Sequence, residues 1–523
     1  MNKKNNTVFI TSVIISIIIS VWGIAGSESF EKVANSLMNW VTEKTGWLYL
    51  ISMLIFVIFA LAIAFSKYGK IKLGPDDSKP EFNTISWFGM LFGAGMGIGL
   101  VFYGIAEPIS HYISPIEGIA PASEQAARFA MRASFVHWGI HPWAAYSIIG
   151  LGLAYIQFRK NKPGLISSLF IPLIGEERVN GPIGKAIDIF SVIATIAGVA
   201  TSLGMGTMQI NSGMSYLFNL PNNNTTRFII IVIITVIYTW TAVSGIDKGI
   251  NMISNLNLVL AFSSIVICVI VGPKVMMSNN FVGAMGEYIN NFFSDSLSIN
   301  AFGKNSWIQG WRIFYWAWWI AWAPFVGTFI ARISKGRTIR EFICGVIIAP
   351  AVTSLVWFSV FGSMGLNLRN TLGVTALTKM AASPEVALFE VFANYPLGKL
   401  LSIITVILLC TFFITSANSA SFVLSMFSQN GDLNPSKKKI FVWGVMQAVI
   451  AFALMLSGGL KALQTASVAA AFPFIFIMLA ICVSIVKALK SEFIDEKKVE
   501  KSKESIKNKE NVGNNVRYSE NKI

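Results

Sequence analysis

The sequence has few charged side chains: Asp, Glu, Lys and Arg make up 13% of its 523 residues, whereas 54% are hydrophobic. This composition is far too apolar for an ordinary soluble chain of several domains. Apolar stretches long enough to cross a bilayer recur along nearly the whole sequence, separated by short polar loops. We therefore predict a polytopic membrane protein and exclude a single anchor attached to a soluble domain.

Further absences exclude several kinds of site. The four cysteines lie in apolar segments without paired spacing, which argues against a disulfide framework and a zinc site. His137 and His141 are four residues apart, as metal ligands often are, but no third ligand is nearby, and structural hydrogen bonding is favoured. No GxxxxGKS or GxxxxGKT segment occurs, so ATP is not bound by such a loop. No catalytic constellation of His, Asp or Cys is visible, and we predict that the protein is not an enzyme.

The basic residues give the chain a formal charge of +15, which could indicate a nucleic-acid partner. Their distribution argues against one, because they concentrate in alternate loops and in the tail. We predict about twelve spans: 8–26, 47–66, 86–106, 133–157, 187–211, 227–245, 253–273, 307–331, 339–363, 396–425, 440–457 and 467–486. Basic loops follow the even-numbered spans, which places both termini in the cytoplasm of a multi-pass protein of the bacterial inner membrane. The first stretch also has features of a signal peptide, but a retained helix is favoured because many spans follow.

Two segments outside these spans have a distinct character. Residues 274–306 place an apolar stripe on one helical face, which predicts an external interfacial helix. Residues 487–523 are rich in Lys, Glu, Ser and Asn and cannot build a core. We predict that they form a charged cytoplasmic tail, which is either a passive solvated helix or a segment that associates with anionic lipid.

Glycine occupies every second position in part of the third span: Gly93, Gly95, Gly97 and Gly99. One or two such glycines would be explained by close helix packing in lipid. Alternating glycines instead favour local unwinding, which exposes backbone carbonyls to a ligand and is tolerated at membrane depth only beside a cavity. We therefore expect Gly97 and Gly99 to lie at a substrate site.

The eighth span carries an aromatic stripe at helical spacing: Trp311, Tyr315, Trp318 and Trp322, flanked by Trp319. Tryptophan often marks the headgroup region, which would explain Trp311 but not the three tryptophans near mid-span. Indole faces in a dry cavity attract a cation that cannot donate hydrogen bonds, such as a trimethylammonium group, by about 2 kcal/mol or more. The stripe therefore favours a quaternary ammonium ligand.

Two other groups of side chains could complete such a site. A second aromatic group lies around Pro142 in the fourth span: Trp138, Trp143 and Tyr146. In the tenth span, the hydroxyls of Thr415 and Ser416 could join carbonyls of an unwound third span to bind a small hard cation. No Asp, Glu, Lys or Arg lies near the middle of a predicted span, which favours a neutral cage for sodium over a titrating carboxylate.

At these residues the sequence resembles the betaine/choline/carnitine transporter family. The resemblance rests on GAGMGIGL from Gly93, HWGIHPWAAY from His137, the tryptophan run from Trp316 through PFVG, and TSANSAS from Thr415. It implies an all-α polytopic membrane protein with a LeuT-type core of two inverted five-helix repeats behind two extra N-terminal helices. The glycine-interrupted third span and the eighth span, which we expect to be broken by Pro324 and Gly327, lie five spans apart, as corresponding elements should.

The implied organisation has five parts: 1–85 with two peripheral helices, 86–273 as the first repeat, 274–306 as the external interfacial helix, 307–486 as the second repeat, and 487–523 as the tail. The resemblance also implies roles for individual residues. Trp138, Trp143, Tyr146 and Trp319 would form the central aromatic box, with Trp318, Trp322 and Phe314 on the inward path. Sodium would meet the carbonyls of Gly93, Met96 and Phe412 and the hydroxyls of Thr415 and Ser416. A second sodium site would involve Thr195 and Phe325, although Val199 and Asn418 depart from the family's pattern.

The sequence therefore predicts uptake of glycine betaine, coupled to sodium, by alternating access. Gly99 is neutral where relatives that take up choline often carry Asp, which favours a zwitterionic substrate. Choline or carnitine as substrate, proton coupling and solute exchange are the alternatives. An ion channel is a remote alternative, because repeated polar rings are absent. The resemblance also implies a homotrimer.

Overall fold

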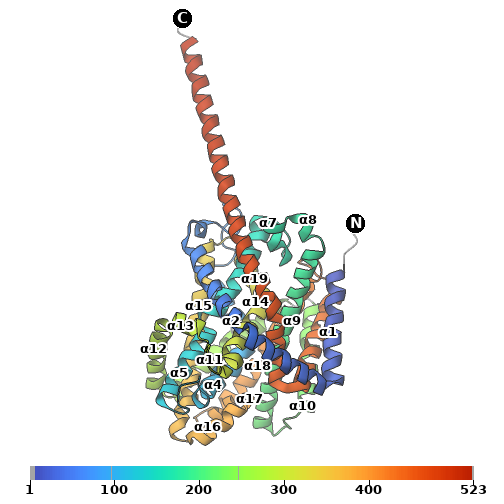
Figure 1. Cartoon of the computed structure of the whole chain (residues 1–523), viewed down its shortest axis with the longest axis vertical. Coiled ribbons are helices and arrows are strands. Elements are labelled where there is room, and N and C mark those ends of the chain that lie inside the picture. Colours follow the sequence, from blue (N-terminus) through green and yellow to red (C-terminus); the bar gives the residue numbers. More distant parts are fainter. Residues whose placement is uncertain (1–5, 96, 245–246, 521–523) are drawn as a thin grey trace.

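The computed structural model describes residues 6–95, 97–244 and 247–520, with side chains except at 92, 94–95, 247–251 and 494–520. Within these ranges the fold is a bundle of α-helices without a β-strand (Figure 1). Nine of the described helices are long and apolar enough to cross a bilayer. The predicted all-α polytopic membrane fold is confirmed.

The first half of the chain forms α1 (Thr7–Ala25), α2 (Ser27–Phe65), α3 (Thr84–Gly95), α4 (Ile98–Ile113), α5 (Glu124–Trp138), α6 (Ile140–Ala154), the short α7 (Ile171–Ile174) and α8 (Glu176–Val179), α9 (Pro182–Phe218) and α10 (Asn224–Ser244). Local signals set several of these ends. Pro182 begins α9, where its missing N–H costs no helical hydrogen bond. Ser123 caps α5 by accepting from the Ala126 N–H at 3.0 Å.

The second half forms α11 (Asp247–Val271), α12 (Lys274–Asn290), α13 (Phe292–Leu297), α14 (Phe314–Arg332), α15 (Ile339–Asn367), α16 (Gly373–Ala382), α17 (Pro384–Phe392), α18 (Gly398–Phe427) and α19 (Lys437–Glu520). A capping box between Thr338 and Glu341 begins α15. α12 lies within the segment 274–306, for which an external interfacial helix is predicted, and a π-helical turn, Ile308–Ile313, leads into α14.

The predicted third and fourth spans are each divided into two helices. α3 ends at Gly95 and α4 begins at Ile98, so the predicted unwinding in the glycine segment is confirmed. α5 and α6 are separated at Gly139, where a Cβ would lie 2.7 Å from the Tyr288 hydroxyl. That hydroxyl accepts the N–H of Ile140 at 3.0 Å. The predicted eleventh and twelfth spans are joined in α19, which bends at Gly458 and Gly459.

The predicted break in the eighth span is wrong. α14 continues through Pro324 to Arg332. Gly327 serves close packing instead, because a Cβ there would lie 2.7 Å from the Cβ of Ile149 on α6. α14 packs against α6, α9 and α19, and most of its side chains are buried. The helix that carries the tryptophans is therefore a continuous central element.

The outer helices expose large apolar side chains, as lipid-facing helices do. Ile233 and Trp240 on α10 are 54% and 64% exposed, and Phe262 on α11 is 67% exposed. In water such faces would be an aggregation hazard, whereas in a bilayer they meet hydrocarbon.

Loops that were predicted to share one side of the membrane meet at one end of the bundle. The segment between α2 and α3 pairs with the segment between α14 and α15 through a bridge of Lys72 with Thr338. The N–H of Leu73 donates to the Arg337 carbonyl at 2.8 Å, and the N–H of Gly336 donates to the Leu73 carbonyl at 2.9 Å. We call this pairing the loop junction. The start of α1 and the end of α19 lie toward the same end of the bundle (Figure 1).

The base of the charged tail is fixed beside the loop junction. Glu492 on α19 is 6% exposed and bonds to Tyr155 and Arg159, and Lys160 lies 3.1 Å from it. Arg159 also donates to the carbonyl of Gly74 at 2.8 Å. From Glu492 the helix continues to Glu520 and projects beyond the bundle (Figure 1).

Candidate functional site

A small cavity lies inside the bundle, between the interrupted α3–α4 segment, α6 and α14. Its lining residues are Gly97, Gly99, Leu100, Trp138, Pro142, Trp143, Tyr146, Ser202, Trp318, Trp319, Trp322 and Ser354. The open volume is about 30 Å³, which is room for one or two water molecules. The side chains around it therefore nearly fill the site.

Eight of the nine residues predicted to meet a substrate line this cavity: Gly97, Gly99, Trp138, Trp143, Tyr146, Trp318, Trp319 and Trp322. Phe314 does not line it. Its ring stacks on Trp318 with the centroids 5.5 Å apart, so it supports the wall from behind. The lining residues that the sequence analysis did not name are Leu100, Ser202 and Ser354.

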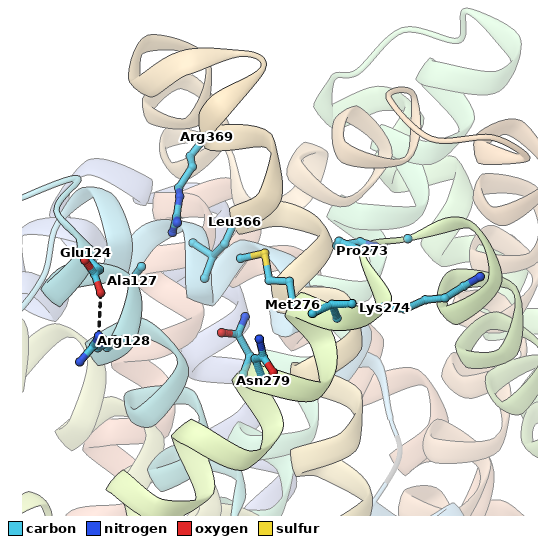
Figure 2. Close-up of a pocket in the computed structure, with 12 residues that line it drawn as sticks. Glu124, Ala127, Arg128, Pro273, Lys274, Met276, Asn279, Leu366 and Arg369 are labelled. Carbon is cyan, nitrogen blue, oxygen red and sulfur yellow. Dashed lines mark hydrogen bonds and ion pairs between the residues drawn. The ribbon is translucent and has the colours of Figure 1, made fainter.

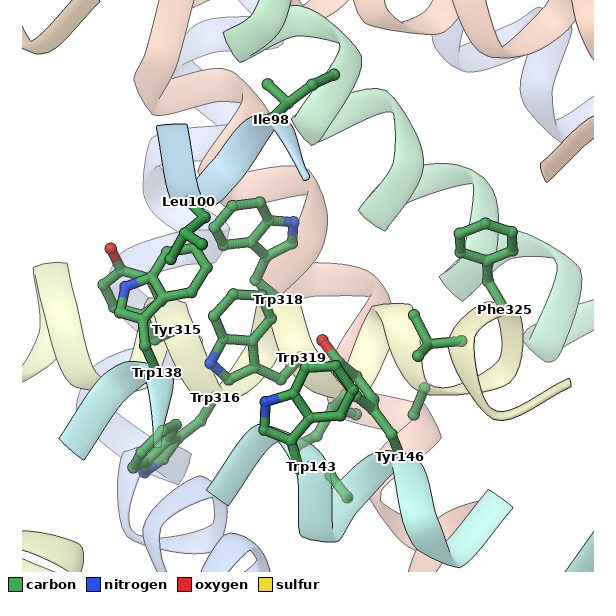
Figure 3. Close-up of a cluster of buried hydrophobic side chains, with 14 of the residues drawn as sticks. Ile98, Leu100, Trp138, Trp143, Tyr146, Tyr315, Trp316, Trp318, Trp319 and Phe325 are labelled. Carbon is green, nitrogen blue, oxygen red and sulfur yellow. The ribbon is translucent and has the colours of Figure 1, made fainter. Parts of the chain in front are cut away.

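The aromatic rings form a cluster around Trp319 (Figure 3). The Trp318 and Trp319 rings are stacked at 4.7 Å, and the Trp138 ring meets Trp319 edge-on at 4.8 Å. Trp143 and Tyr146 on α6 form a further perpendicular pair at 5.5 Å. Rings from α5, α6 and α14 thus surround one small volume, which is the arrangement that recognises a desolvated cation.

Hydrogen bonds fix two of the indoles at this wall. The Nε1–H of Trp319 donates to the His137 carbonyl at 2.9 Å, and that of Trp322 donates to the Gly198 carbonyl at 2.7 Å. A Cβ on Gly198 would lie 2.6 Å from Trp322, so this close approach requires glycine. The Trp319 and Trp322 rings are therefore oriented before a ligand arrives.

The glycine segment brings the start of α4 to the cavity. The N–H groups of Leu100 and Val101 donate to the Gly97 carbonyl, and these are the first hydrogen bonds of α4. The first N–H groups of a helix have no partner within it and carry partial positive charge, which favours an anion there. None of the cavity's described lining residues is Asp, Glu, Lys or Arg. The site thus offers aromatic faces for a cation and a helix start for an anion, without a net side-chain charge.

The predicted sodium ligands on α18 lie beside α11. Thr415 Oγ1 lies 3.2 Å from the carbonyl of Phe412 and accepts from Asn257 Nδ2 at 3.2 Å. The next residue of α11, Leu258, is the neighbour that a Cβ on Gly93 would meet, at 3.9 Å. Gly93 and Thr415 therefore each lie near α11, and Ser416, the residue after Thr415, is half-buried.

Three predicted sodium ligands remain without such geometry. Met96 lies outside the described residues. Thr195 and Phe325, predicted for a second site, are buried on α9 and α14, which pack together. Thr195 Oγ1 is a buried oxygen without a hydrogen-bond partner in the described structure. An unsatisfied buried hydroxyl fits a cation ligand, but a single oxygen does not make a site.

A model of the betaine/carnitine/choline family of transporters matches residues 7–494. The chain belongs to this family. It is 47% identical, over 94% of its length and 99% of the relative's, to a probable glycine betaine transporter of Desulfitobacterium hafniense (strain Y51). It is 46% identical, over 96% of its length and 98% of the relative's, to the glycine betaine transporter OpuD of Bacillus subtilis (strain 168). An ectoine/hydroxyectoine transporter of Virgibacillus pantothenticus is 40% identical over 96% of the chain and 100% of its own length.

Membership of the betaine/carnitine/choline family makes this protein a multi-pass membrane transporter and not an enzyme. The family resemblance drawn from the glycine and tryptophan segments is thereby confirmed. The same segments supply most of the cavity lining described above.

The transporter also contains a buried carboxylate that the sequence analysis placed wrongly. The predicted third span, 86–106, ends before Glu107 and leaves it in the following loop, but α4 continues to Ile113 and buries Glu107 completely. Arg312, before α14, is 1% exposed. Glu107 and Arg312 lie near the ends of predicted spans, so buried ionisable side chains occur there, outside the mid-span region to which the prediction of a neutral sodium cage refers.

Glu107, His111 and His137 have ligand atoms within 4.8 Å of one another, a composition that could hold a metal ion. The remaining ring nitrogens face Trp307 and Arg312, and both histidines already bond to Glu107. The predicted structural hydrogen bonding of His137 is confirmed. His141 lies apart from this group and bonds to Ser296 Oγ at 2.8 Å.

A larger pocket of about 680 Å³ opens at the surface of the transporter, between α5, α12 and the end of α15 (Figure 2). Lys274 and Arg369 contribute to its lining, together with an ion pair of Glu124 and Arg128 at 2.6 Å. It shares no lining residue with the aromatic cavity.

Proposed function

We propose that this transporter takes up glycine betaine, coupled to sodium, by alternating access. The observation that carries the proposal is the aromatic cavity, in which tryptophan and tyrosine rings from three helices surround a volume next to the interrupted helix α3–α4. Two relatives of nearly full-length similarity are described as glycine betaine transporters, one of them as probable. Chemistry and similarity therefore favour the same substrate.

The charges of the cavity support a zwitterion over a cation. The trimethylammonium group of betaine would meet the indole faces, and its carboxylate would meet the first N–H groups of α4. The lining contains Gly99 where an acidic side chain would be needed to balance choline. Ectoine, the substrate named for a relative at 40% identity, is the competitor that must be tested beside choline and carnitine.

The placement of Thr415 and the Phe412 carbonyl beside Asn257 supports sodium as the coupling ion. Carbonyl, hydroxyl and amide oxygens are neutral hard ligands, as a small monovalent cation requires. The amide oxygen of Asn257 is buried without a hydrogen-bond partner in the described structure, so it is available as an additional ligand. A neutral ligand set would hold sodium without binding a proton in its place.

The size of the cavity supports a change of conformation during transport. A volume of about 30 Å³ does not hold betaine, so side chains or helices must move to admit it. We propose that the two halves 86–273 and 307–486 are inverted repeats of a LeuT-type core and supply this motion. The loop junction would then face the cytoplasm, and the transporter would assemble as a trimer in lipid.

Uptake into proteoliposomes tests the proposal. Radiolabelled betaine, choline, carnitine and ectoine are compared under a sodium gradient alone and a proton gradient alone. We expect betaine to accumulate only with sodium. Accumulation of another solute without betaine would overturn the substrate assignment, and accumulation under a proton gradient without sodium would overturn the coupling ion.

A further inference from the structure

We propose that Glu107 is a positioning residue for the substrate site: its ionised carboxylate holds the Trp138 indole at the cavity wall and thereby sets the affinity for the quaternary ammonium group. This inference rests on the proposed function. It starts from the hydrogen bond between Trp138 Nε1 and Glu107 Oε2, which measures 2.9 Å inside a fully buried cluster.

Both oxygens of Glu107 receive two contacts. Oε2 lies 2.9 Å from Trp138 Nε1 and 2.5 Å from the Tyr315 hydroxyl. Oε1 lies 2.7 Å from His137 Nδ1 and 3.1 Å from His111 Nε2. A carboxylate has about four acceptor positions, so these four contacts can saturate it.

The protons on the two histidines follow from their other neighbours. Trp307 Nε1 can only donate, and it lies 3.2 Å from His111 Nδ1, so that nitrogen accepts and Nε2 carries the proton. Arg312 Nε also can only donate, and it lies 3.2 Å from His137 Nε2. His137 therefore carries its proton on Nδ1. Both imidazoles are neutral and donate to Glu107.

With four donors directed at it, Glu107 must be ionised. A protonated carboxyl would point its own hydrogen at one of these donors and leave a buried group unpaired. The negative charge is balanced through His137 by Arg312, which also donates to the Asp295 carbonyl. Removing one partner from such a buried network leaves another buried polar or charged group without a partner, which is strongly destabilising. The intact network therefore favours a single arrangement of its side chains.

This arrangement reaches the cavity through Trp138. Its indole lines the cavity and meets Trp319 at 4.8 Å, and a Cβ on Gly99 would lie 3.1 Å from its ring. Accepting the N–H at a charged oxygen fixes the ring plane and increases the electron density of its face, which is the side that attracts a cation. Glu107 thus acts on the substrate through an indole and does not touch it.

The test compares the KM and maximal rate of betaine uptake in proteoliposomes for wild type and Glu107→Gln. The amide has one oxygen and one NH₂ group, so it cannot accept all four donors. We expect the KM to rise about tenfold, the scale of a lost hydrogen bond to a charged group, with a smaller change in the maximal rate. Glu117→Gln is the matched control, because Glu117 lies in the loop after α4 and bonds to Ser306; its KM should not change.

A double-mutant cycle separates positioning from general stability. Trp138→Phe keeps an aromatic face but has no N–H for Glu107 to accept. In that background Glu107→Gln should raise the KM less than about twofold further, because coupled residues are not additive. Full additivity of the two substitutions, or an unchanged KM in Glu107→Gln alone, would overturn the proposal.

Glu107→Asp keeps the inference testable if Glu107→Gln does not insert. It retains the charge opposite Arg312 but withdraws the carboxylate by one methylene, so the KM should still rise; an unchanged KM in this variant would also overturn the proposal. Betaine uptake by the wild-type protein distinguishes a failure of the proposed function from a failure of the role proposed for Glu107. Wild-type vesicles that fail to take up betaine defeat the proposed function, whereas wild-type uptake with unaffected variants defeats only the role of Glu107.

Discussion

Gly99 lies directly against the indole of Trp318: a Cβ on Gly99 would come within 2.4 Å of Cη2 of that ring. Contacts below 3.0 Å do not persist between such atoms, so the ring or the helix would have to move. The absence of a side chain at Gly99 therefore lets α4 and α14 approach at the cavity.

Gly99→Ala should reduce betaine uptake strongly. Overpacking of this kind costs about 1–3 kcal/mol, and here the strain falls on Trp318 at the cavity wall. Gly97→Ala is the comparison, because a Cβ there meets no atom within 4 Å. We expect it to reduce betaine uptake much less than Gly99→Ala does. Initial uptake rates, corrected for protein in the membrane, measure the difference. Equal rates for the two variants would show that the contact with Trp318 does not matter.

Trp319→Ala should weaken betaine binding about 30-fold, because losing an indole from a desolvated cation site removes about 2 kcal/mol. Trp240→Ala provides the control, since this side chain is 64% exposed on α10 and does not line the cavity, unlike that of Trp319. Betaine dependence of uptake measures the affinity. If Trp319→Ala retains the wild-type affinity, the aromatic cavity is not the substrate site.

Thr415→Val should raise the sodium concentration for half-maximal uptake about tenfold, because it keeps the shape of the side chain but removes an oxygen near the Phe412 carbonyl. Thr415→Ser retains the hydroxyl and should stay close to wild type. Sodium titrations at saturating betaine distinguish the variants. The same sodium dependence in Thr415→Val and Thr415→Ser would remove this hydroxyl from the coupling site.

Glu492→Gln should destabilise the protein by about 3 kcal/mol, because it breaks a buried charged contact and leaves Arg159 with fewer partners. Glu176→Gln is a control, since the ion pair of Glu176 with Lys162 is exposed and contributes little. Thermal unfolding in detergent reports the loss. A melting curve unchanged from wild type would mean that the base of the tail is not held by Glu492.

Truncation after Phe493 should test whether the tail senses osmotic stress. This end point keeps Glu492 and the contact of Phe493 with Tyr68 at 5.5 Å, so stability is preserved while the charged segment is removed. Anionic lipid attracts each basic residue near the surface by about 1 kcal/mol, and we expect the activation of uptake by external osmolality to shift. An unchanged activation curve would leave the tail with a passive role.

The sequence predicted most of the fold and most of the cavity lining because these depend on local patterns. Runs of apolar residues mark the helices, and alternating glycines mark the interruption between α3 and α4. The break expected at Pro324 did not form, since a proline can remain within a helix when neighbouring helices support it. The sequence therefore predicted where the helices lie better than it predicted whether each helix is continuous.

Contacts between distant segments could not be predicted in the same way. Glu107 follows an apolar run and reads as the start of a loop, and its partners His137 and Tyr315 are 30 and 208 residues away. Asn257 was detectable only as one of two asparagines, with Asn255, near the start of an apolar span. Its contact with Thr415 depends on how α11 packs against α18. Burial and charge compensation across helices appear only when the helices are placed together.

The loop junction has a mechanical consequence for the bundle. α1 and α2 precede the predicted repeats, yet the chain that leaves α2 shares backbone hydrogen bonds with the chain that leaves α14. Each such bond contributes about 0.5–1.5 kcal/mol. Any displacement of α14 at this end must move the segment after α2 with it or break these hydrogen bonds. The end of α2 is therefore mechanically linked to the helix that carries the tryptophans.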